Sequence, residues 1–133
     1  MDGETNSRSI RIALEKPSLM CFQSKKEMPA KPTSFGVVAI IRQGDLFLAI
    51  RRGESLRAGG MVCFPGGHVE AGEQDSTAVV RECHEELSID VVPLDEVWKS
   101  VTDWGTALSW WTVEPLQPCC PVAHPIEVQE FFW

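Results

Sequence analysis

Apolar residues along this chain gather in short runs bounded by glycine, proline or acidic turns. The run at residues 35–41 is FGVVAII, the run at residues 46–50 is LFLAI, and the turn Gln43-Gly44-Asp45 separates them. Two such runs around a short turn predict a hairpin of largely buried strands. A further short strand is expected at residues 61–64, after a glycine-rich loop at residues 53–60 that contains Arg57.

The second half of the chain shows the same pattern after one helical stretch. Residues 89–102, interrupted at Pro93, and residues 106–115 predict two strands around the turn at residues 103–105. Residues 117–125 are rich in proline and predict a loop. The chain therefore predicts several strands around a single well-marked helix.

That helix is expected at residues 75–88. Asp75 or Ser76 is the predicted N-cap, because short polar side chains satisfy the first free backbone N–H groups. An apolar stripe runs along one face at helical spacing, and its members are Val79, Val80, Cys83 and Leu87. We expect this stripe to pack on the strands.

Three glutamates form a second stripe on the same helix. Glu82, Glu85 and Glu86 lie at i, i+3 and i+4, and therefore project from one face, turned roughly a third of a circle from the apolar stripe. Like charges at this spacing each cost about a few tenths of a kcal/mol, so the cluster is easier to explain with a cation over it. Oxygen ligands suit Mg2+ or Mn2+. The alternative is a solvated acidic face without a ligand.

The residues before the helix favour the metal site over the solvated face. The segment FPGG at residues 64–67 ends the predicted strand with two glycines, whose lack of side chains lets main-chain carbonyls approach a metal. A loop containing Glu70, Gly72 and Glu73 then leads to the helix. Strand, glycine loop and acidic helix thus follow in the order that a metal site needs.

Residues 67–89, which read GHVEAGEQDSTAVVRECHEELSI, resemble the Nudix box. The family pattern is G, five residues, E, seven residues, R-E, an apolar residue, any residue, E-E, any residue, G, apolar. The residues in register are Gly67, Glu73, Arg81, Glu82, Cys83, Glu85, Glu86 and Ile89. Ser88 departs, because the family usually has glycine there. The resemblance covers about a sixth of the chain.

The resemblance implies a MutT-like Nudix hydrolase with the α+β Nudix fold, a mixed β-sheet sandwiched between α-helices. Residues 34–133 are the expected domain, and residues 1–33, polar with three prolines, predict an irregular N-terminal extension. The family usually adds a closing helix after the segment at residues 127–133, where this chain stops on Phe131-Phe132-Trp133. We therefore expect either truncation or a partner that covers an exposed apolar end.

Composition limits the partners and the compartment. A chain of 133 residues with 44% apolar residues fits one globular domain. Its net charge of -7 argues against direct binding of nucleic acid. No apolar run approaches the roughly 20 residues of a membrane span, and residues 1–11 lack the apolar core of a secretory signal. The expected location is the cytoplasm, without membrane association.

The cysteine content is also compatible with the cytoplasm. There are five, an odd number, which favours reduced thiols. Cys119 and Cys120 with His124 are possible zinc ligands, but adjacent cysteines lack the C-x-x-C spacing of such sites.

The resemblance also implies a mechanism: water attacks phosphorus of a nucleoside diphosphate linked to another moiety, with Mg2+ or Mn2+ as Lewis acid. Glu82, Glu85 and Glu86 would hold the metal, with the main-chain carbonyl of Gly66 as a further ligand. Gly67, Glu73 and Arg81 would support the motif. Arg81 leaves the acidic face on the helix wheel, so we expect it to orient Glu73 through a bidentate pair, a structural salt bridge being the equal alternative.

The general base is harder to place. Family members often add a glutamate from a loop beyond the box, and Glu127 is the best positional candidate, with Glu130 and Glu114 as rivals. His68 and His84 have suitable intrinsic pKa values. A lone histidine in a loop or on a polar helix face is more often a surface residue, so neither is assigned a role.

Substrate recognition depends on residues outside the box. Arg51, Arg52 and Arg57 are candidates for phosphate contacts, the alternative being a solvated basic loop. Trp104 is a candidate for stacking on a base. Trp110 and Trp111 are neighbours in a predicted strand, so they point to opposite faces and at most one of them lines a given pocket.

Three functions remain open from the sequence. A nucleoside triphosphate or modified nucleotide is the first choice of substrate. A coenzyme A or ADP-ribose type diphosphatase is the alternative, since GMVCFPGG at residues 60–67 partly resembles the coenzyme A branch. A non-catalytic module that binds a nucleotide or a protein is the competing class, and the intact acidic triad argues against it. A monomer and a homodimer are both compatible with the sequence.

Overall fold

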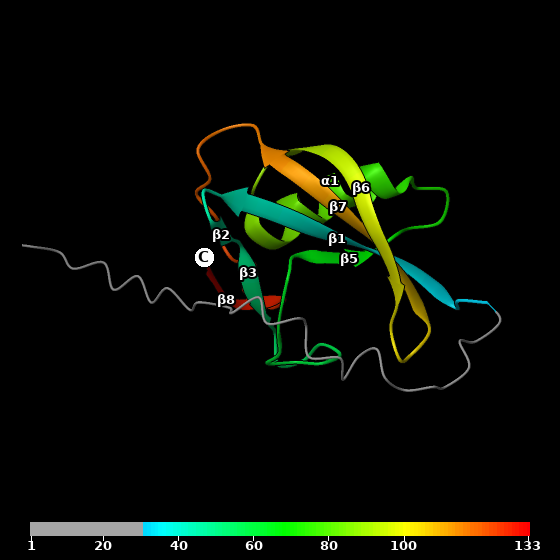
Figure 1. Ribbon diagram of the computed structural model, residues 1–133. Helices are drawn as coiled ribbons and strands as arrows, with labels where there is room; N and C mark the ends of the chain where they lie inside the picture. Colours follow the sequence, from blue (N-terminus) through cyan, green and yellow to red (C-terminus); the bar gives the residue numbers. More distant parts are fainter. Residues whose placement is uncertain (1–30) are drawn as a thin grey trace, which may run out of the picture.

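The computed structural model describes residues 31–133, which form two β-sheets and one α-helix (Figure 1). The strands in chain order are β1 (Ser34–Gln43), β2 (Leu46–Phe47), β3 (Ala49–Arg52), β4 (Val62–Cys63), β5 (Gly66–His68), β6 (Val91–Val101), β7 (Thr106–Pro115) and β8 (Val128–Phe132). The helix, α1 (Asp75–Leu87), follows β5. The expected α+β fold class is confirmed.

The larger sheet is mixed, as expected. Its strand order is β2-β1-β7-β6, and β5 pairs with the first part of β1. Strand β1 runs parallel to β7 and antiparallel to β2 and β5, while β6 is antiparallel to β7. Pro93 does not interrupt β6, because β6 is an edge strand and its register shifts between Pro93 and Asp95.

The smaller sheet has the order β4-β3-β8 and corrects the predicted hairpin. Only Arg42 and Gln43 of β1 pair with β2, after which the Leu48 N–H donates to the Ile41 carbonyl at 2.9 Å and the chain leaves the sheet. Strand β3 then pairs with β4 and β8 instead of β1. An apolar run identifies a buried strand, but it does not identify the strand beside it.

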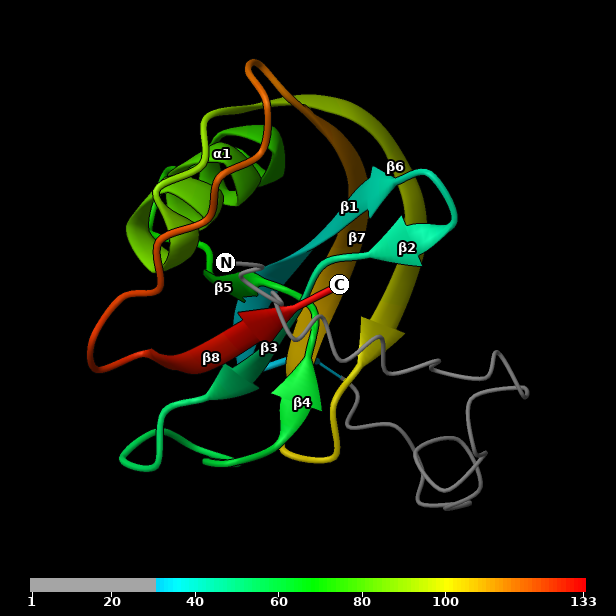
Figure 2. The same ribbon diagram turned by 90° about the vertical axis from the view of Figure 1, so that its left-hand side faces the viewer.

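Helix α1 covers one face of the larger sheet (Figure 2). Its Val79, Cys83 and Leu87 are fully buried and Val80 is half-buried against the same core, as the apolar stripe predicted. Alternate residues of β1, namely Val37, Ala39 and Ile41, complete this core from the sheet. Packing of the apolar stripe fixes the helix, so the acidic face must point elsewhere.

The two ends of α1 differ from the prediction. Gln74 is the N-cap and its side chain makes no capping hydrogen bond, so the expected caps Asp75 and Ser76 are wrong. Asp75 lies instead in the first turn, where its charge complements the helix dipole. Ser88 ends the helix at φ 53°, in the left-handed region that favours glycine. This conformation explains why glycine is the usual residue at that position.

The C-terminal segment is not an exposed apolar end. Phe131 and Phe132 lie in β8, opposite Ile50 and Ala49 of β3. Phe131 and Trp133 are half-buried against the core.

Residues 1–30 of the predicted N-terminal extension lie outside the described residues. Thr33, which follows them, donates its N–H to the Gly105 carbonyl at 3.0 Å. Within residues 31–133, no helix is long and apolar enough to cross a membrane.

Candidate active site

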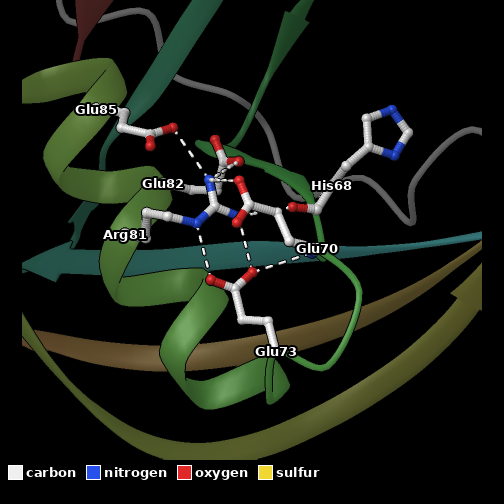
Figure 3. Close-up of polar contacts among 6 residues, drawn as sticks. All are labelled: His68, Glu70, Glu73, Arg81, Glu82 and Glu85. Carbon is white, nitrogen blue, oxygen red and sulfur yellow. Dashed lines mark hydrogen bonds and ion pairs between the residues drawn. The ribbon is translucent and has the colours of Figure 1, made fainter.

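Arg81 is the centre of the polar network on α1 (Figure 3). Its Nε and Nη2 donate to the two oxygens of Glu73 at 2.8 and 2.9 Å, which is the predicted bidentate pair. Nη2 also donates to the His68 carbonyl at 2.9 Å. Nη1 donates to Glu82 at 2.9 Å and to Glu85 at 3.1 Å. All five guanidinium N–H groups thus have acceptors.

This geometry differs from the helix-wheel expectation. The backbone of Arg81 leaves the acidic face, but its long side chain reaches back over that face and contacts Glu82 and Glu85. The hydrogen bond from Arg81 is the main reason that the pKa of Glu73 is lowered to about 2. Glu73 in turn accepts the Glu70 N–H at 3.1 Å, which closes the loop before the helix. Arg81 therefore ties the loop to the acidic face.

Glu82 faces the glycine pair. It is 8% exposed, and a Cβ atom on Gly67 would overlap its carboxylate. Burial is the largest influence on the pKa of Glu82 and raises it, while Arg81 opposes this rise. Gly67 lies in β5 opposite Val37 of β1, so the glycine pair begins a strand of its own instead of ending the preceding one. The absence of a side chain at Gly67 creates the space that Glu82 occupies.

Glu86 is the most deeply placed carboxylate of the cluster. It is 5% exposed, and its Oε2 atom has no hydrogen-bond partner. Burial, followed by the negative charges of Glu82 and Glu127, raises the pKa of Glu86 to about 8. The backbone hydrogen bond from Gly66 and the charge of Arg52 offset this rise only in part. A buried carboxylate with an unpartnered oxygen is costly unless positive charge compensates it.

Glu127 lies near this cluster although it is 41 residues beyond Glu86 in the chain. Its negative charge contributes to the raised pKa of both Glu82 and Glu86. The rival candidates lie elsewhere: Glu130 is exposed and bonds Arg51 at 2.9 Å, and Glu114 is exposed on β7. The fold thus brings Glu127, the preferred candidate for the general base, toward the acidic helix.

The two histidines that received no role are both exposed. His84 contacts Asp90 at 3.0 Å on the surface of the helix end. His68 supplies only its backbone carbonyl to Arg81, and its ring points away from the carboxylates (Figure 3). The same two side chains therefore stay outside the acidic cluster.

The predicted substrate-binding residues divide into two groups. Arg57 and Trp104 meet, with the guanidinium carbon 5.6 Å from the centre of the exposed ring. Arg52 lies near Glu86 and Cys63 and donates to the Arg57 carbonyl at 2.9 Å. Arg51 is already engaged by Glu130 and by the Gly60 carbonyl at 2.9 Å. Arg52, Arg57 and Trp104 therefore form one connected region, and Arg51 lies beside it.

The tryptophan pair of β7 points to opposite sides, as expected. Trp110 contacts the rings of Phe64 and Trp98, and Trp111 packs partly against the core beneath α1. Trp98 is the one member of this aromatic group on the edge strand β6. Alternation along the strand separates the two indoles.

The donor set fits a hard divalent cation. Within residues 31–133, no group of three or more His, Cys, Asp or Glu side chains is arranged to hold a metal ion, and Arg81 binds one oxygen each of Glu82 and Glu85. The free oxygen of Glu86 and its raised pKa nevertheless mark a position where positive charge is lacking. Carboxylate oxygens are the ligands that Mg2+ and Mn2+ prefer. The chemistry of these donors therefore suits such an ion.

One residue of the site was missed by the sequence reasoning. His124 entered only as a zinc candidate, yet its backbone N–H donates to the Glu86 carbonyl at 2.8 Å. Its ring nitrogen Nδ1 accepts the Glu127 N–H at 3.1 Å. No periodicity or motif marks this residue, because its contacts join segments far apart in the chain.

Replacing Arg81 by lysine is expected to weaken Mn2+ binding by about 10- to 100-fold, because lysine keeps the charge but loses the planar fork that orients Glu73, Glu82 and Glu85. Electron paramagnetic resonance of free Mn2+ in a titration measures this change. Arg42→Lys is the matched control, since Arg42 contacts only exposed groups near the β1–β2 turn. Unchanged Mn2+ binding in Arg81→Lys contradicts the orienting role.

Comparison with known proteins agrees with this geometry. The family model described as the NUDIX domain matches residues 30–123. No curated protein matches the chain. Among solved structures, the MutT protein from Methanosarcina mazei is 28% identical with a TM-score of 0.67, the alignment covering 79% of this chain and 78% of that one. The E. coli ORF135 protein is 27% identical with a TM-score of 0.59, over 75% of this chain and 71% of that one.

A third neighbour shows the fold alone. An ADP-ribose pyrophosphatase from Streptococcus suis is 20% identical with a TM-score of 0.58, over 74% of this chain and 70% of that one. The family match spans most of the chain and contains the whole acidic helix with its glycine pair. The chain therefore belongs to the Nudix family of hydrolases.

Proposed function

We propose that this Nudix hydrolase is a Mg2+- or Mn2+-dependent pyrophosphohydrolase that acts on nucleoside diphosphate-linked substrates. The observation that carries the proposal is Glu86, a buried carboxylate with an unpartnered oxygen and a pKa raised to about 8. A divalent cation beside Glu86 supplies the missing positive charge and restores the ionised carboxylate. The intact set of Glu82, Glu85 and Glu86 argues against the competing non-catalytic module.

In this proposal Glu82, Glu85 and Glu86 hold the metal, with the Gly66 carbonyl as a further ligand. When bound, the divalent cation supplies Lewis acidity and neutralises negative charge on the diphosphate. Arg81 keeps Glu82 and Glu85 oriented through its Nη1 donors while Glu73 anchors the other side of the guanidinium. Gly67 leaves room for the carboxylate of Glu82.

Glu127 takes the proton of the attacking water in this proposal. Its support is position: the fold brings the charge of Glu127 close to Glu82 and Glu86 from a separate segment. A general base contributes about 10²- to 10⁴-fold to rate. Glu82 and Glu85 would hold the metal and are not assigned a proton-transfer role.

Substrate recognition is assigned to the loops beside the acidic helix. Trp104, half exposed and under the Arg57 guanidinium, offers a stacking surface for a base. Arg52 and Arg57, with Arg51 at the edge, offer charge for phosphates. A nucleoside triphosphate or modified nucleotide is the first choice of substrate. ADP-ribose and coenzyme A are the alternatives, and a reducing cytoplasm is the proposed location.

A substrate panel tests the proposal. Nucleoside triphosphates, oxidised guanine nucleotides, ADP-ribose, dinucleoside polyphosphates and coenzyme A are each incubated with Mg2+ or EDTA, and phosphate and pyrophosphate release is measured. We expect turnover of at least one nucleotide that EDTA abolishes and that Glu85→Gln lowers by about a thousandfold, because an exposed ligand of the metal is lost. Turnover that persists in EDTA, or that Glu85→Gln leaves intact, contradicts the metal mechanism.

A further inference from the structure

The segment that joins β7 to β8, residues 116–127, crosses the C-terminal end of α1 (Figure 2). We call it the strap. Its Val122 N–H donates to the Leu87 carbonyl and its His124 N–H donates to the Glu86 carbonyl, both at 2.8 Å. These carbonyls belong to the last turn of α1, where no intrahelical donor remains for them. The strap is therefore fixed to the backbone of the proposed metal ligand Glu86.

His124 also organises the turn that follows it. Its Nδ1 accepts the N–H of Ile126 at 3.3 Å and of Glu127 at 3.1 Å. Its carbonyl accepts the N–H of Val128, the first residue of β8, at 3.1 Å. Two N–H groups that point at Nδ1 require this nitrogen to act as an acceptor, so the proton of the neutral ring is on Nε2. One residue thus bonds both the metal helix and the turn that carries Glu127.

Gly53 holds Glu127 from the opposite side. The Gly53 N–H donates to the Glu127 carbonyl at 2.9 Å. A Cβ atom on Gly53 would overlap the Ile126 carbonyl and lie 3.3 Å from the carbonyl carbon of Glu127. Both polar backbone groups of Glu127 are therefore engaged, the N–H by His124 and the carbonyl by Gly53. The charge of Glu127 is close enough to Glu82 and Glu86 to raise the pKa of both.

We propose that His124 is a positioning residue for catalysis: it holds Glu127 against the acidic helix by accepting the Glu127 N–H while its own N–H is anchored on Glu86. The inference rests on the proposed role of Glu127 as general base. His124 touches no reacting atom in this account. It fixes the distance between two carboxylates that lie 41 residues apart in the sequence, which matters because a small misplacement of a catalytic group lowers the rate steeply.

The chain offers a conservative replacement that separates this role from general packing. Asparagine at position 124 can accept backbone N–H groups two and three residues ahead with its Oδ1, as in an Asx-turn. His124→Ala removes this acceptor but keeps the backbone bonds to Glu86 and Val128. With the panel substrate turned over fastest, we expect His124→Ala to lower kcat by about 10- to 100-fold with little change in KM, and His124→Asn to restore most of it.

A double-mutant cycle tests whether His124 acts through Glu127. Glu127→Gln alone is expected to lower kcat by about 10²- to 10⁴-fold. If His124 works only by placing Glu127, the double variant His124→Ala/Glu127→Gln is no slower than Glu127→Gln. Additive losses in the double variant overturn the proposal. His84→Ala, at an exposed histidine on α1 that contacts Asp90, is the control.

A second readout needs neither substrate nor metal. Amide hydrogen exchange of Glu127, measured by NMR on the full chain treated with EDTA, is expected to accelerate at least tenfold in His124→Ala and to return toward the native rate in His124→Asn. Native exchange in His124→Ala overturns the hydrogen bond and with it the inference. If exchange is faster in His124→Ala but kcat is unchanged in Glu127→Gln, the general-base assignment is overturned. The positioning role of His124 then fails as well. A reduced kcat in Glu127→Gln with native kcat in His124→Ala overturns the positioning role alone.

Discussion

Replacing Glu86 by glutamine is expected to lower kcat by about a thousandfold while making the metal-free protein more stable at pH 8. The loss of rate follows because a neutral amide cannot contribute negative charge to a divalent cation, and a thousandfold corresponds to about 4 kcal/mol of transition-state stabilisation. The gain in stability follows because Glu86 is 5% exposed, with an unpartnered oxygen. A substitution that improves the fold and removes activity is typical of a ligand position.

The pH dependence of stability has a definite sign. The folded-state pKa of Glu86 is about 8, above its ordinary value of 4.5, so between these two values the folded protein holds a proton that the unfolded chain has released. The free energy of unfolding therefore falls as pH rises through this window, by about 1.4 kcal/mol per unit and by up to about 5 kcal/mol in total. Below pH 4.5 the contribution is fully retained, and above pH 8 it is lost.

Urea denaturation of EDTA-treated protein at pH 5 and pH 8 measures this effect. We expect the wild type to be less stable at pH 8, Glu86→Gln to lack this part of the pH dependence, and Mg2+ to stabilise the wild type but not the variant. Glu114→Gln, at an exposed glutamate on β7, is the control and should behave as the wild type. If the free energy of unfolding depends on pH equally in wild type and Glu86→Gln, Glu86 is not a buried carboxylate that lacks a compensating cation.

Replacing Gly67 by alanine is expected to lower kcat by about a hundredfold with a fall in Tm of only a few degrees. The added Cβ overlaps the carboxylate of Glu82, the far end of a flexible side chain. Glu82 can move aside, which spares the fold but breaks its contact with Arg81 and removes it from the metal position. Mn2+ titration should show weaker binding in the same variant. Native Mn2+ binding and native kcat in Gly67→Ala contradict the placement of Glu82.

The neighbouring glycine is a matched contrast. A Cβ on Gly66 overlaps the Val37 carbonyl oxygen and lies 3.0 Å from the Val38 Cα, both of which are backbone atoms of β1. Backbone in the centre of a sheet cannot move aside, so Gly66→Ala is expected to destabilise the fold by about 3 kcal/mol and to lower Tm by more than about 10 °C. Thermal unfolding of both variants by circular dichroism separates the two cases. Similar Tm values for the two alanine variants would show that backbone and side-chain crowding do not differ here.

The amino-acid sequence by itself determined the helix, its two faces and the family. Glutamates at i, i+3 and i+4 must share a face, and the apolar stripe of Val79, Cys83 and Leu87 must lie on another, because both follow from the helical period. The strands at residues 35–41 and 106–115 were equally clear from their apolar content. Local signals of this kind need no knowledge of distant segments.

Pairing between strands was decided by the tertiary structure alone. Leu46 and Phe47 pair with β1 across the predicted turn, but β3 pairs with β4 and β8 and not with β1. The C-terminal Phe131 looked exposed in the sequence because its partner, Ile50, lies about 80 residues earlier. An apolar side chain indicates that its residue will be buried, but it does not indicate which segment will pack against it.

The electrostatic character of the site was likewise decided by the fold. The sequence shows three equivalent glutamates, whereas the structure exposes Glu85, packs Glu82 beneath Gly67 and buries Glu86 with one free oxygen. The roles proposed for Arg81, Glu127 and His124 depend on residues outside their own segments: Arg81 bonds Glu73 and the His68 carbonyl, while Glu127 and His124 lie near Glu86. Helical periodicity acts over a few residues and can be read from the chain, but burial and charge depend on which distant segments pack together, and only the folded domain determines that.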